Sequence, residues 1–438
     1  MTKQFIKSNL SRFLLLGCFI LITFFLVLNR HSRAGSFNYH SEIWSDKAGY
    51  YIYLPATFNY KFNPKLFPDS IETKTGNGFT LDYENKIIKT KYTYGVAFLQ
   101  LPFYLLANSI SFLFNIDTGG FSVIHHKSID IASVFYLLFG LFFLKRFLDN
   151  YFLKSVVYKV LIVLFLGTNL FYYSIDETGM SHIYSFAMFS LFLFILKDTD
   201  FLKHAAIPQK LLFGLVATLI ILIRPINLIF LTSYFFLDIK GSHCLLMRLK
   251  TLVQPKNAVP IFLVFFLFIA PQLLYWKYAY NSFLSYSYGD EKFSWSKPLI
   301  LETLFSVNNG LIPFTPLYIL IFLTLAYMIK RRLNSTRYII FYFITLIYLL
   351  SCWWDRAFGC AFGARNFVEH SALFSIVVAF AFKWLETQNK IKKFSFYLFI
   401  SLIIILNLKM TYTYDGCFPG NGDWDWEAYG RLIFSPPK

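Results

Sequence analysis

Long apolar blocks, rather than alternating apolar and polar positions, dominate this chain of 438 residues. Such runs predict membrane-spanning helices, because a helix needs about 20 mostly apolar residues to cross the hydrocarbon layer. Two of the blocks are short and meet at Arg224-Pro225, so we expect a helical hairpin that turns there at the outer interface. Spans are expected within residues 13–28, 129–144, 156–173, 183–196, 211–223, 226–237, 259–276, 311–329, 338–352, 367–382 and 394–408.

The first block has basic residues before it, which places the N-terminus on the inner side. This pattern is also typical of a signal peptide, with a poor cleavage site at Ser32-Arg33-Ala34. We favour a retained membrane anchor, because many further spans follow.

The topology depends on residues 94–114, an apolar block that Gln100, Pro102 and Asn108 interrupt. If this block crosses the membrane, the basic loop at residues 145–154 lies outside and every later basic loop is inverted. If it is instead a half-buried helix on the outer face, lysine and arginine collect in the inner loops and account for nearly all of the formal net charge of +17. The second arrangement predicts eleven spans, with the N-terminus inside and the C-terminus outside.

The expected fold is therefore an all-α polytopic membrane protein, with residues 1–438 as a single transmembrane domain. Composition agrees, because 56% of residues are hydrophobic and only 15% are charged, too few charges for a soluble surface. The basic balance follows from topology and does not indicate nucleic acid. The outer face should hold residues 29–128 as a first loop with interfacial helices, residues 277–310 between spans seven and eight, and a tail at residues 410–438.

Candidate chemistry begins in the first outer loop, where Glu42 and Asp46 are four positions apart. On a helix they would share one face, and a carboxylate at the membrane surface can act as general base on an acceptor hydroxyl. The alternative is an ordinary solvated acid beside Lys47. The tyrosines at positions 50, 51 and 53 favour a packed interfacial helix over a loose loop.

A second outer turn carries Asp176, Glu177 and His182 close to the bilayer. Helix capping is the plain interpretation for Asp176. It explains His182 less well, because ionisable groups at the membrane edge are candidates for function.

Arginines mark the remaining outer segments. Arg365 ends a segment, residues 353–365, that contains two glycines. The guanidinium of Arg365 and accessible backbone N–H groups of this segment would suit a phosphate. A snorkelling arginine beside a tryptophan belt, or an ion pair between Arg365 and Glu369, would explain the same pattern. Arg224 is at least as well explained by snorkelling as by ligand contact.

The five cysteines show no metal-type spacing, so a zinc site of the usual Cys/His pattern is not expected. Cys360 and Cys417 are both predicted outside, where a disulfide between them would be permitted. The sequence leaves their pairing open.

Taken together, these segments resemble the GT-C superfamily of integral-membrane glycosyltransferases, akin to the bacterial protein mannosyltransferase and aminoarabinose transferase families. The likeness covers nearly the whole chain. It rests first on an acid followed by tyrosines after span one, which are Asp46, Tyr50 and Tyr51. The second feature is an aromatic-Gly-x-x-x-Leu-x-x-Pro helix with Tyr94, Gly95, Leu99 and Pro102. The others are an acidic turn at Asp176 and Glu177 and a long later loop at residues 277–310.

The resemblance implies a GT-C-like bundle in the bacterial inner membrane with a periplasmic active site. It implies a polyprenyl-phosphate-linked sugar as donor and Asp46 as the catalytic acid, with Glu42 as the alternative. Lys47 follows Asp46 where an adjacent acid would be expected, so the use of a divalent metal is left open.

In this hypothesis the sugar passes with inversion to a periplasmic glycan, lipid or protein, while apolar grooves between spans hold the prenyl chain. Arg365, with Arg224 or Lys277, would neutralise the leaving lipid phosphate, and His182 would contact phosphate or acceptor. A transporter or flippase of lipid-linked saccharides is the alternative, and an assembly subunit without a site is a third. A transporter should carry charges near the bilayer midplane, where only Lys159 stands out, so the pattern favours the enzyme.

Overall fold

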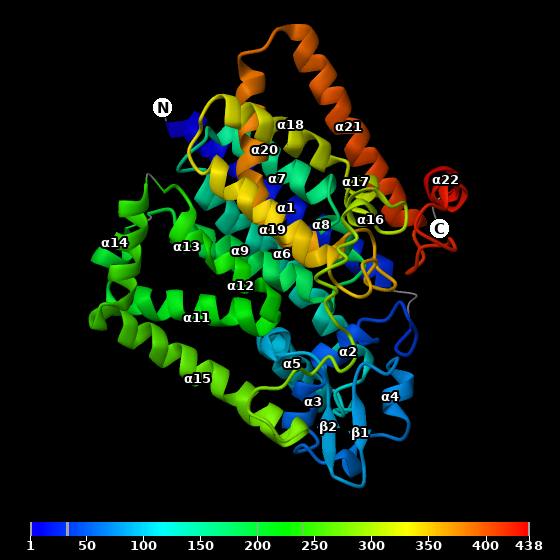
Figure 1. The fold of residues 1–438 in the computed structure, drawn as a ribbon. Helices are drawn as coiled ribbons and strands as arrows, with labels where there is room; N and C mark the ends of the chain where they lie inside the picture. The colour runs from blue at the N-terminus through cyan, green and yellow to red at the C-terminus, as the bar shows by residue number, and fades with distance from the viewer. Residues whose placement is uncertain (1, 32–34, 199, 240, 437–438) are drawn as a thin grey trace. The chain divides into compact units, whose positions relative to one another are not determined.

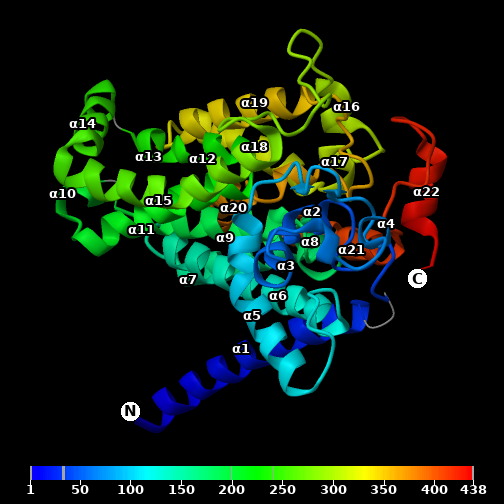
Figure 2. The same cartoon turned by 90° about the horizontal axis from the view of Figure 1, so that it is seen from below.

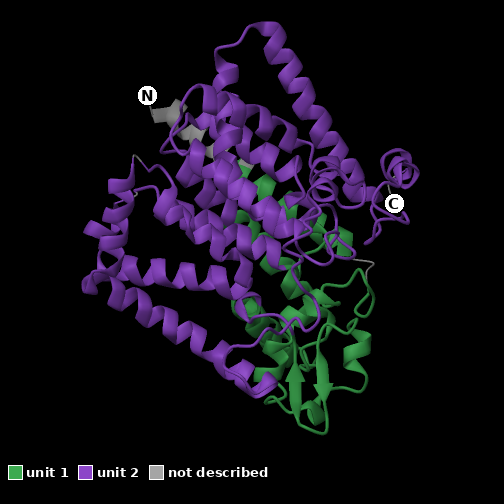
Figure 3. Cartoon of the chain, viewed as in Figure 1, with its two compact units in different colours: residues 1–90, 97–139, 173–180 green, residues 91–96, 140–172, 181–438 purple. Residues whose placement is uncertain are grey.

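A computed structural model describes residues 2–31, 35–198, 200–239 and 241–436. The polypeptide within these ranges is mostly helical, with a single two-stranded sheet. It forms two compact units, one of residues 1–90, 97–139 and 173–180 and the other of residues 91–96, 140–172 and 181–438 (Figure 3). The all-helical class is confirmed, and the expected single transmembrane domain stays a prediction. The proposed cleavage site at residues 32–34 lies outside the described ranges.

Each predicted apolar block lies within or overlaps helical structure. Within the described residues, four helices are long and apolar enough to cross a membrane: α5 (Gly95–Leu113), α6 (Val123–Leu148), α15 (Pro255–Tyr280) and α21 (Lys390–Thr413). Helix α5 is the block that we assigned to the outer face, and its length and composition would also allow it to span. The count of eleven spans and the orientation therefore stay predictions.

Unit 1 contains α1 (Thr2–His31), most of α5 and the first part of α6. The loop between α1 and α5 holds several short helices, whose interfacial location stays a prediction, and also a β-hairpin that we did not expect. Its elements are α2 (Asp46–Tyr51), α3 (Tyr53–Phe58), η1 (Pro64–Leu66), α4 (Ile71–Lys74), β1 (Thr80–Asp82) and β2 (Ile87–Lys89). The antiparallel strands β1 and β2 lie side by side (Figure 1). Leu81 lies opposite Ile88, and both of these side chains are buried.

Unit 2 is a helical bundle around α20 (Ser371–Glu386), which packs against α7 (Lys154–Leu166), α9 (Ser181–Ile195), α18 (Leu317–Lys330) and α21. Helix α20 is mostly buried, as its many alanine, valine and phenylalanine residues allow. Beside it, α11 (Ile207–Ile223) runs against α9 and α15, as two views of the bundle show (Figures 1 and 2). Helix α19 (Thr336–Ser351) packs on α18 and α16 (Ile300–Phe305).

Three predicted spans are broken. The block at 156–173 divides at Gly167 into α7 and α8 (Leu170–Ile175), and the block at 311–329 divides at Thr315-Pro316 into α17 (Leu311–Phe314) and α18. Proline explains the second break, since it lacks the N–H that continues a helix. The block at 226–237 forms three short helical pieces: η2 (Pro225–Asn227), α12 (Leu228–Leu231) and α13 (Ser233–Phe236).

The remaining short helices were not predicted from the sequence. They are α10 (Phe201–His204), α14 (Ser242–Val253) and α22 (Trp426–Phe434), and a 3-10 turn, η3 (Arg365–Phe367), precedes α20. All of them lie in polar or amphipathic segments between the apolar blocks.

Candidate functional site

Asp46 is the first residue of α2, in unit 1. The chain enters this helix through Ser45, whose φ of 49° is left-handed, and the Ser45 amide donates to the carbonyl oxygen of Thr75 at 2.8 Å. Asp46 is half-buried, whereas Tyr50 and Tyr51 on the same helix are buried. The Tyr51 hydroxyl donates to the carbonyl oxygen of Gly120 at 2.5 Å. The expectation of a packed aromatic helix after the first acid is therefore confirmed.

Glu42 lies in a buried polar cluster rather than beside Asp46 on a helix. Its Oε2 accepts from His126 Nδ1 at 3.0 Å, and its Oε1 accepts from Lys127 Nζ at 2.5 Å. The same ammonium lies 3.1 Å from Asp130 Oδ2, and Thr178 donates to Asp130 Oδ1 at 2.9 Å. We call His31, Glu42, His126, Lys127 and Asp130 the Glu42 cluster.

The electrostatics of this cluster keep Glu42 ionised. Burial alone would raise the pKa of Glu42, but hydrogen bonds to its oxygens, above all the one from His126, hold that pKa well below its usual range. A carboxylate whose two oxygens are both engaged in this way is a poor proton acceptor. Of the two predicted catalytic acids, Glu42 is therefore the less suitable base.

The acidic turn after α8 is held by ion pairs within unit 1. Arg30 Nε lies 2.5 Å from Asp176 Oδ1, and Lys47 Nζ lies 2.9 Å from Glu177 Oε2. Lys47 is buried, so the residue next to Asp46 anchors α2 to this turn. These contacts replace helix capping as the explanation for Asp176.

Unit 2 brings two other predicted residues together on a carboxylate. Glu369, fully buried, accepts from His182 Nδ1 at 2.8 Å through one oxygen and from Arg224 Nη1 at 3.0 Å through the other. Arg365 is close enough to act electrostatically on His182. We call His182, Arg224, Arg365 and Glu369 the Glu369 cluster.

Two arginines and one carboxylate give the Glu369 cluster a net positive charge when the imidazole is neutral. Next to Glu369, His370 Nδ1 contacts the Tyr342 hydroxyl at 2.5 Å, so the neighbouring imidazole is also held in place. Charge of this sign, partly withdrawn from water, suits an anionic group such as a phosphate.

The helix break before Pro225 places Arg224. Arg224 ends α11 in an extended conformation, and Gly95 lies directly against the backbone of Leu222 and Ile223. A β-carbon at Gly95 would overlap these backbone atoms, so only glycine permits this approach. The glycine of the aromatic-glycine motif therefore packs against the segment that carries Arg224.

Arg365 is half-buried and begins η3, after a loop that several contacts fix. Gly363 has a left-handed φ of +63°, and its N–H donates to Asn309 Oδ1 at 3.2 Å. Three residues earlier, Cys360 forms a disulfide with Cys417, which answers the pairing that the sequence left open. The loop before Arg365 is thus tied both to the segment before α17 and to the C-terminal tail.

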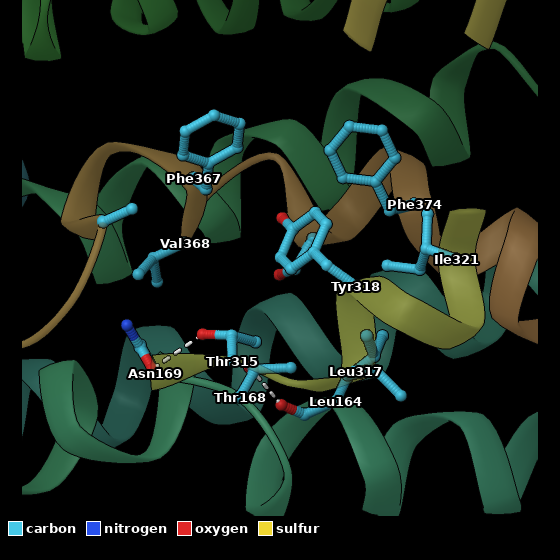
Figure 4. Close-up of a pocket in the computed structure, with 12 residues that line it drawn as sticks. Leu164, Thr168, Asn169, Thr315, Leu317, Tyr318, Ile321, Phe367, Val368 and Phe374 are labelled. Atoms are coloured by element: carbon cyan, nitrogen blue, oxygen red, sulfur yellow. Dashed lines mark hydrogen bonds between the residues drawn. The ribbon is translucent and has the colours of Figure 1, made fainter. Parts of the chain in front are cut away.

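A narrow cavity lies beside this loop, between α18, α20 and the break after α7 (Figure 4). Thr315 donates to Asn169 Oδ1 at 2.9 Å on its wall, and Tyr318, Phe367 and Phe374 supply much of its apolar surface. Its volume of about 10 Å³ matches about one water molecule, so this cavity does not accommodate a sugar.

Lys277 and Tyr94, the remaining predicted ligands, also belong to unit 2. Lys277 is exposed, and its ammonium lies 2.8 Å from Asn281 Oδ1 just beyond the end of its own helix. Tyr94 connects the start of α5 to α15, since its amide donates to Gln272 Oε1 at 3.0 Å and its hydroxyl donates to the Phe268 carbonyl oxygen at 2.5 Å.

The predicted residues therefore fall into two groups, each described within its own unit. Asp46, Glu42, Asp176 and Glu177 belong to unit 1, whereas His182, Arg224, Arg365, Lys277 and Tyr94 belong to unit 2. The convergence of Asp46 and Arg365 on one bond stays a prediction.

Sequence reasoning missed the partners of these residues. His126, Lys127 and Asp130 lie in the first two turns of α6, and the only ionisable residue that we singled out within a span was Lys159. A signal was present, because ionisable residues at the edge of a long apolar block are costly unless they are paired. Glu369 was assigned to Arg365 by its spacing, whereas the described hydrogen bonds join it to His182 and Arg224.

No protein-family model, curated protein or solved structure matches this chain.

Proposed function

We propose that this protein is a polyprenyl-phosphate-sugar-dependent glycosyltransferase of the bacterial inner membrane. The observation that carries the proposal is the Glu369 cluster, in which Arg224 and His182 engage one buried carboxylate and Arg365 lies close enough to act electrostatically on His182. In this proposal Arg365 and Arg224 supply positive charge for a lipid phosphate, and Glu369 fixes the orientation of Arg224 and His182. The four long apolar helices support placement in a membrane.

The proposed reaction is a single displacement at the anomeric carbon. The acceptor hydroxyl attacks this carbon, Asp46 takes the hydroxyl proton, and the bond between the sugar and the phosphate oxygen breaks with its electron pair leaving on the phosphate. Arg365 and Arg224 would neutralise the charge that develops on the departing lipid phosphate. One displacement inverts the anomeric configuration.

Asp46 is the better general base for this reaction than Glu42. Glu42 is buried and engaged by Lys127 and His126, whereas Asp46 is half-buried on a helix that Lys47 and Glu177 anchor. In this proposal Glu42 holds the first loop in place, and Asp46 acts on the acceptor.

The proposed orientation places the site in the periplasm. Positive residues in the loops assigned to the inside support it, and so does the disulfide between Cys360 and Cys417, since disulfides persist mainly in oxidising compartments. The acceptor would then be a periplasmic glycan, lipid or protein.

The test is an assay of the purified full-length protein with a panel of polyprenyl-phosphate sugars and candidate acceptors, which measures release of the lipid phosphate. We expect release from wild type and a loss of about 100-fold or more in Asp46→Asn, because the general base is removed. Asp69→Asn is the matched control, since Asp69 is an exposed aspartate of the same loop. Full activity of Asp46→Asn would remove the catalytic assignment.

A transporter or flippase of lipid-linked saccharides is the second candidate, and the charged residues of α6 favour it. Asp130 is a buried ionisable residue near the start of a helix long enough to span, and ionisable residues within spans can line transport paths. Proteoliposomes distinguish the two functions. An enzyme releases lipid phosphate, whereas a flippase moves the intact sugar lipid across the bilayer without cleaving it.

A further inference from the structure

The Glu42 cluster contains a set of side chains that can ligate a metal ion. His31, Glu42 and Asp130 each offer one ligand atom, and these atoms all lie within 4.8 Å of one another. They come from three places in unit 1: the end of α1, the loop before α2, and α6. All three side chains are buried, so an ion held there would be largely shielded from water.

The orientation of His31 is the second observation. His31 Nε2 lies 3.0 Å from the carbonyl oxygen of Ile175, which can only accept, so Nε2 carries the proton. Nδ1 then presents a lone pair, and among the described residues it has no hydrogen-bond partner. The closest carboxylate oxygen, Glu42 Oε1, lies 3.6 Å from it. Two acceptors that face each other in a buried site repel unless a cation lies between them.

The surroundings of these ligands match the usual support of a metal site. A metal-bound histidine commonly donates its other N–H to a backbone carbonyl, as His31 does to Ile175. Thr178 donates to Asp130 Oδ1 at 2.9 Å and so orients that carboxylate. His126 does the same for Glu42 Oε2.

We propose that His31, Glu42 and Asp130 bind one divalent transition-metal ion and that the ammonium of Lys127 competes with it. One imidazole nitrogen and two carboxylate oxygens suit zinc, cobalt or manganese better than magnesium or calcium, which prefer oxygen ligands throughout. The inference is independent of the proposed transfer reaction, because the ion is structural: it fastens the end of α1 to the loop that leads to Asp46.

Lys127 explains how the Glu42 cluster can exist both without a metal ion and with one bound. Its ammonium lies 2.5 Å from Glu42 and 3.1 Å from Asp130, where it balances the two negative charges. A bound divalent ion would balance these two negative charges by itself, so the ammonium of Lys127 would no longer be needed there. The Lys127 side chain is 28% exposed and already lies 3.2 Å from the carbonyl oxygen of His31, so it can withdraw toward solvent.

The experiment measures metal binding by the full-length protein in detergent, after treatment with a chelator and without any transfer assay. Zn²⁺ is titrated in competition with a chromophoric chelator, and bound metal is counted by mass spectrometry. Wild type should bind one Zn²⁺ per chain. Asp130→Asn and His31→Gln should weaken binding at least about 10-fold, since each removes or neutralises a ligand. Co²⁺ adds a readout, because its visible absorption should change when His31 is replaced.

Lys127→Met is the most informative variant, because the proposal predicts that it changes Zn²⁺ affinity in the opposite direction to the ligand variants. If the ammonium competes with the ion, this variant binds Zn²⁺ more tightly than wild type, by about 10-fold or more. Its unfolding temperature should then rise with Zn²⁺ more than that of wild type. Lys145→Met is the matched control, because Lys145 is on the same helix and pairs with Asp149 at 2.6 Å.

Two results would overturn the proposal. One is the absence of bound Zn²⁺ in both wild type and Lys127→Met. The other is equal binding by wild type, His31→Gln and Asp130→Asn, which would place the metal elsewhere. Because the wild-type and Lys127→Met proteins decide the first point, misfolding of the ligand variants does not leave the question open.

Discussion

Arg224 and Glu369, which are 145 positions apart in the chain, form an ion pair with an Nη1–Oε1 distance of 3.0 Å. The second oxygen of Glu369 accepts from His182, so both oxygens of this carboxylate are engaged. The pair joins the end of α11 to the segment before α20. A carboxylate this deeply buried depends on its partners to remain ionised.

The first prediction concerns stability. Arg224→Gln should destabilise the protein by about 3 kcal/mol, because it leaves a buried charge without its counter-ion. The double variant Arg224→Gln/Glu369→Gln should be milder, since it removes both charges. The unfolding temperature in detergent measures each effect, and Lys277→Gln serves as an exposed control. An unfolding temperature for Arg224→Gln equal to that of wild type would contradict this account of the ion pair.

The helical class followed from the sequence because apolar blocks report directly on burial in lipid or protein. Residues 259–276 are an example, since they lie within the continuous helix α15. The same signal does not report where a block breaks. Residues 311–329 read as one span, but Pro316 and Thr315 separate α17 from α18. The hairpin of β1 and β2 was missed because three-residue strands carry too few positions for an alternating pattern.

The candidate site was predictable only in part. Ionisable residues near apolar blocks identified His182 and Arg224, and the structure joins them. Their common partner was missed, because the spacing of Arg365 and Glu369 suggested a local pair while Glu369 bonds to residues far away in sequence. Long-range pairs of this kind depend on how helices pack, which a single sequence does not encode as a local pattern.

The second prediction concerns the lipid phosphate. Under the proposed function, Arg365→Gln should reduce release of lipid phosphate by about 100-fold, because the arginine proposed to stabilise charge in the transition state is lost. Arg365→Lys should restore only part of the activity, since an ammonium lacks the bidentate geometry of a guanidinium. Arg331→Gln, at an exposed position, should behave as wild type. Equal activity of wild type and Arg365→Gln would exclude Arg365 from the reaction.

The third prediction concerns the disulfide. Cys360 and Cys417 are separated by 57 positions, and their bond ties the loop before Arg365 to the tail. Cys360→Ser/Cys417→Ser should lower stability by about 2–4 kcal/mol, and reduction of wild type should have a similar effect. Cys244→Ser is the control, because Cys244 is a free cysteine. Identical unfolding of the oxidised and reduced protein would show that the loop does not need this bond.

The last prediction concerns pH and the tail helix α22. The Asp425 carboxylate accepts from the Ala428 amide at 3.0 Å and from the Asn421 amide at 3.1 Å, and these bonds lower its pKa. A lowered pKa means that the ionised cap favours the folded helix. The stabilisation of α22 by ionised Asp425 is fully present above the pKa of aspartate in the unfolded chain, which is about 4. It is lost as the pH falls through the lower pKa of Asp425 in the folded protein.

Hydrogen exchange of α22, corrected for the intrinsic effect of pH, tests this sign. Protection in wild type should be constant from neutral pH down to about pH 5 and should decrease below about pH 4, where the unfolded chain begins to bind protons. Asp425→Ala should show severalfold faster exchange at neutral pH and no further loss from this group at low pH. Glu427→Gln is the control, because the Glu427–Arg431 pair is exposed and contributes little. If wild type lost protection as the pH rose instead, the stabilising form of Asp425 would be the protonated one, and the cap would have been assigned with the wrong charge.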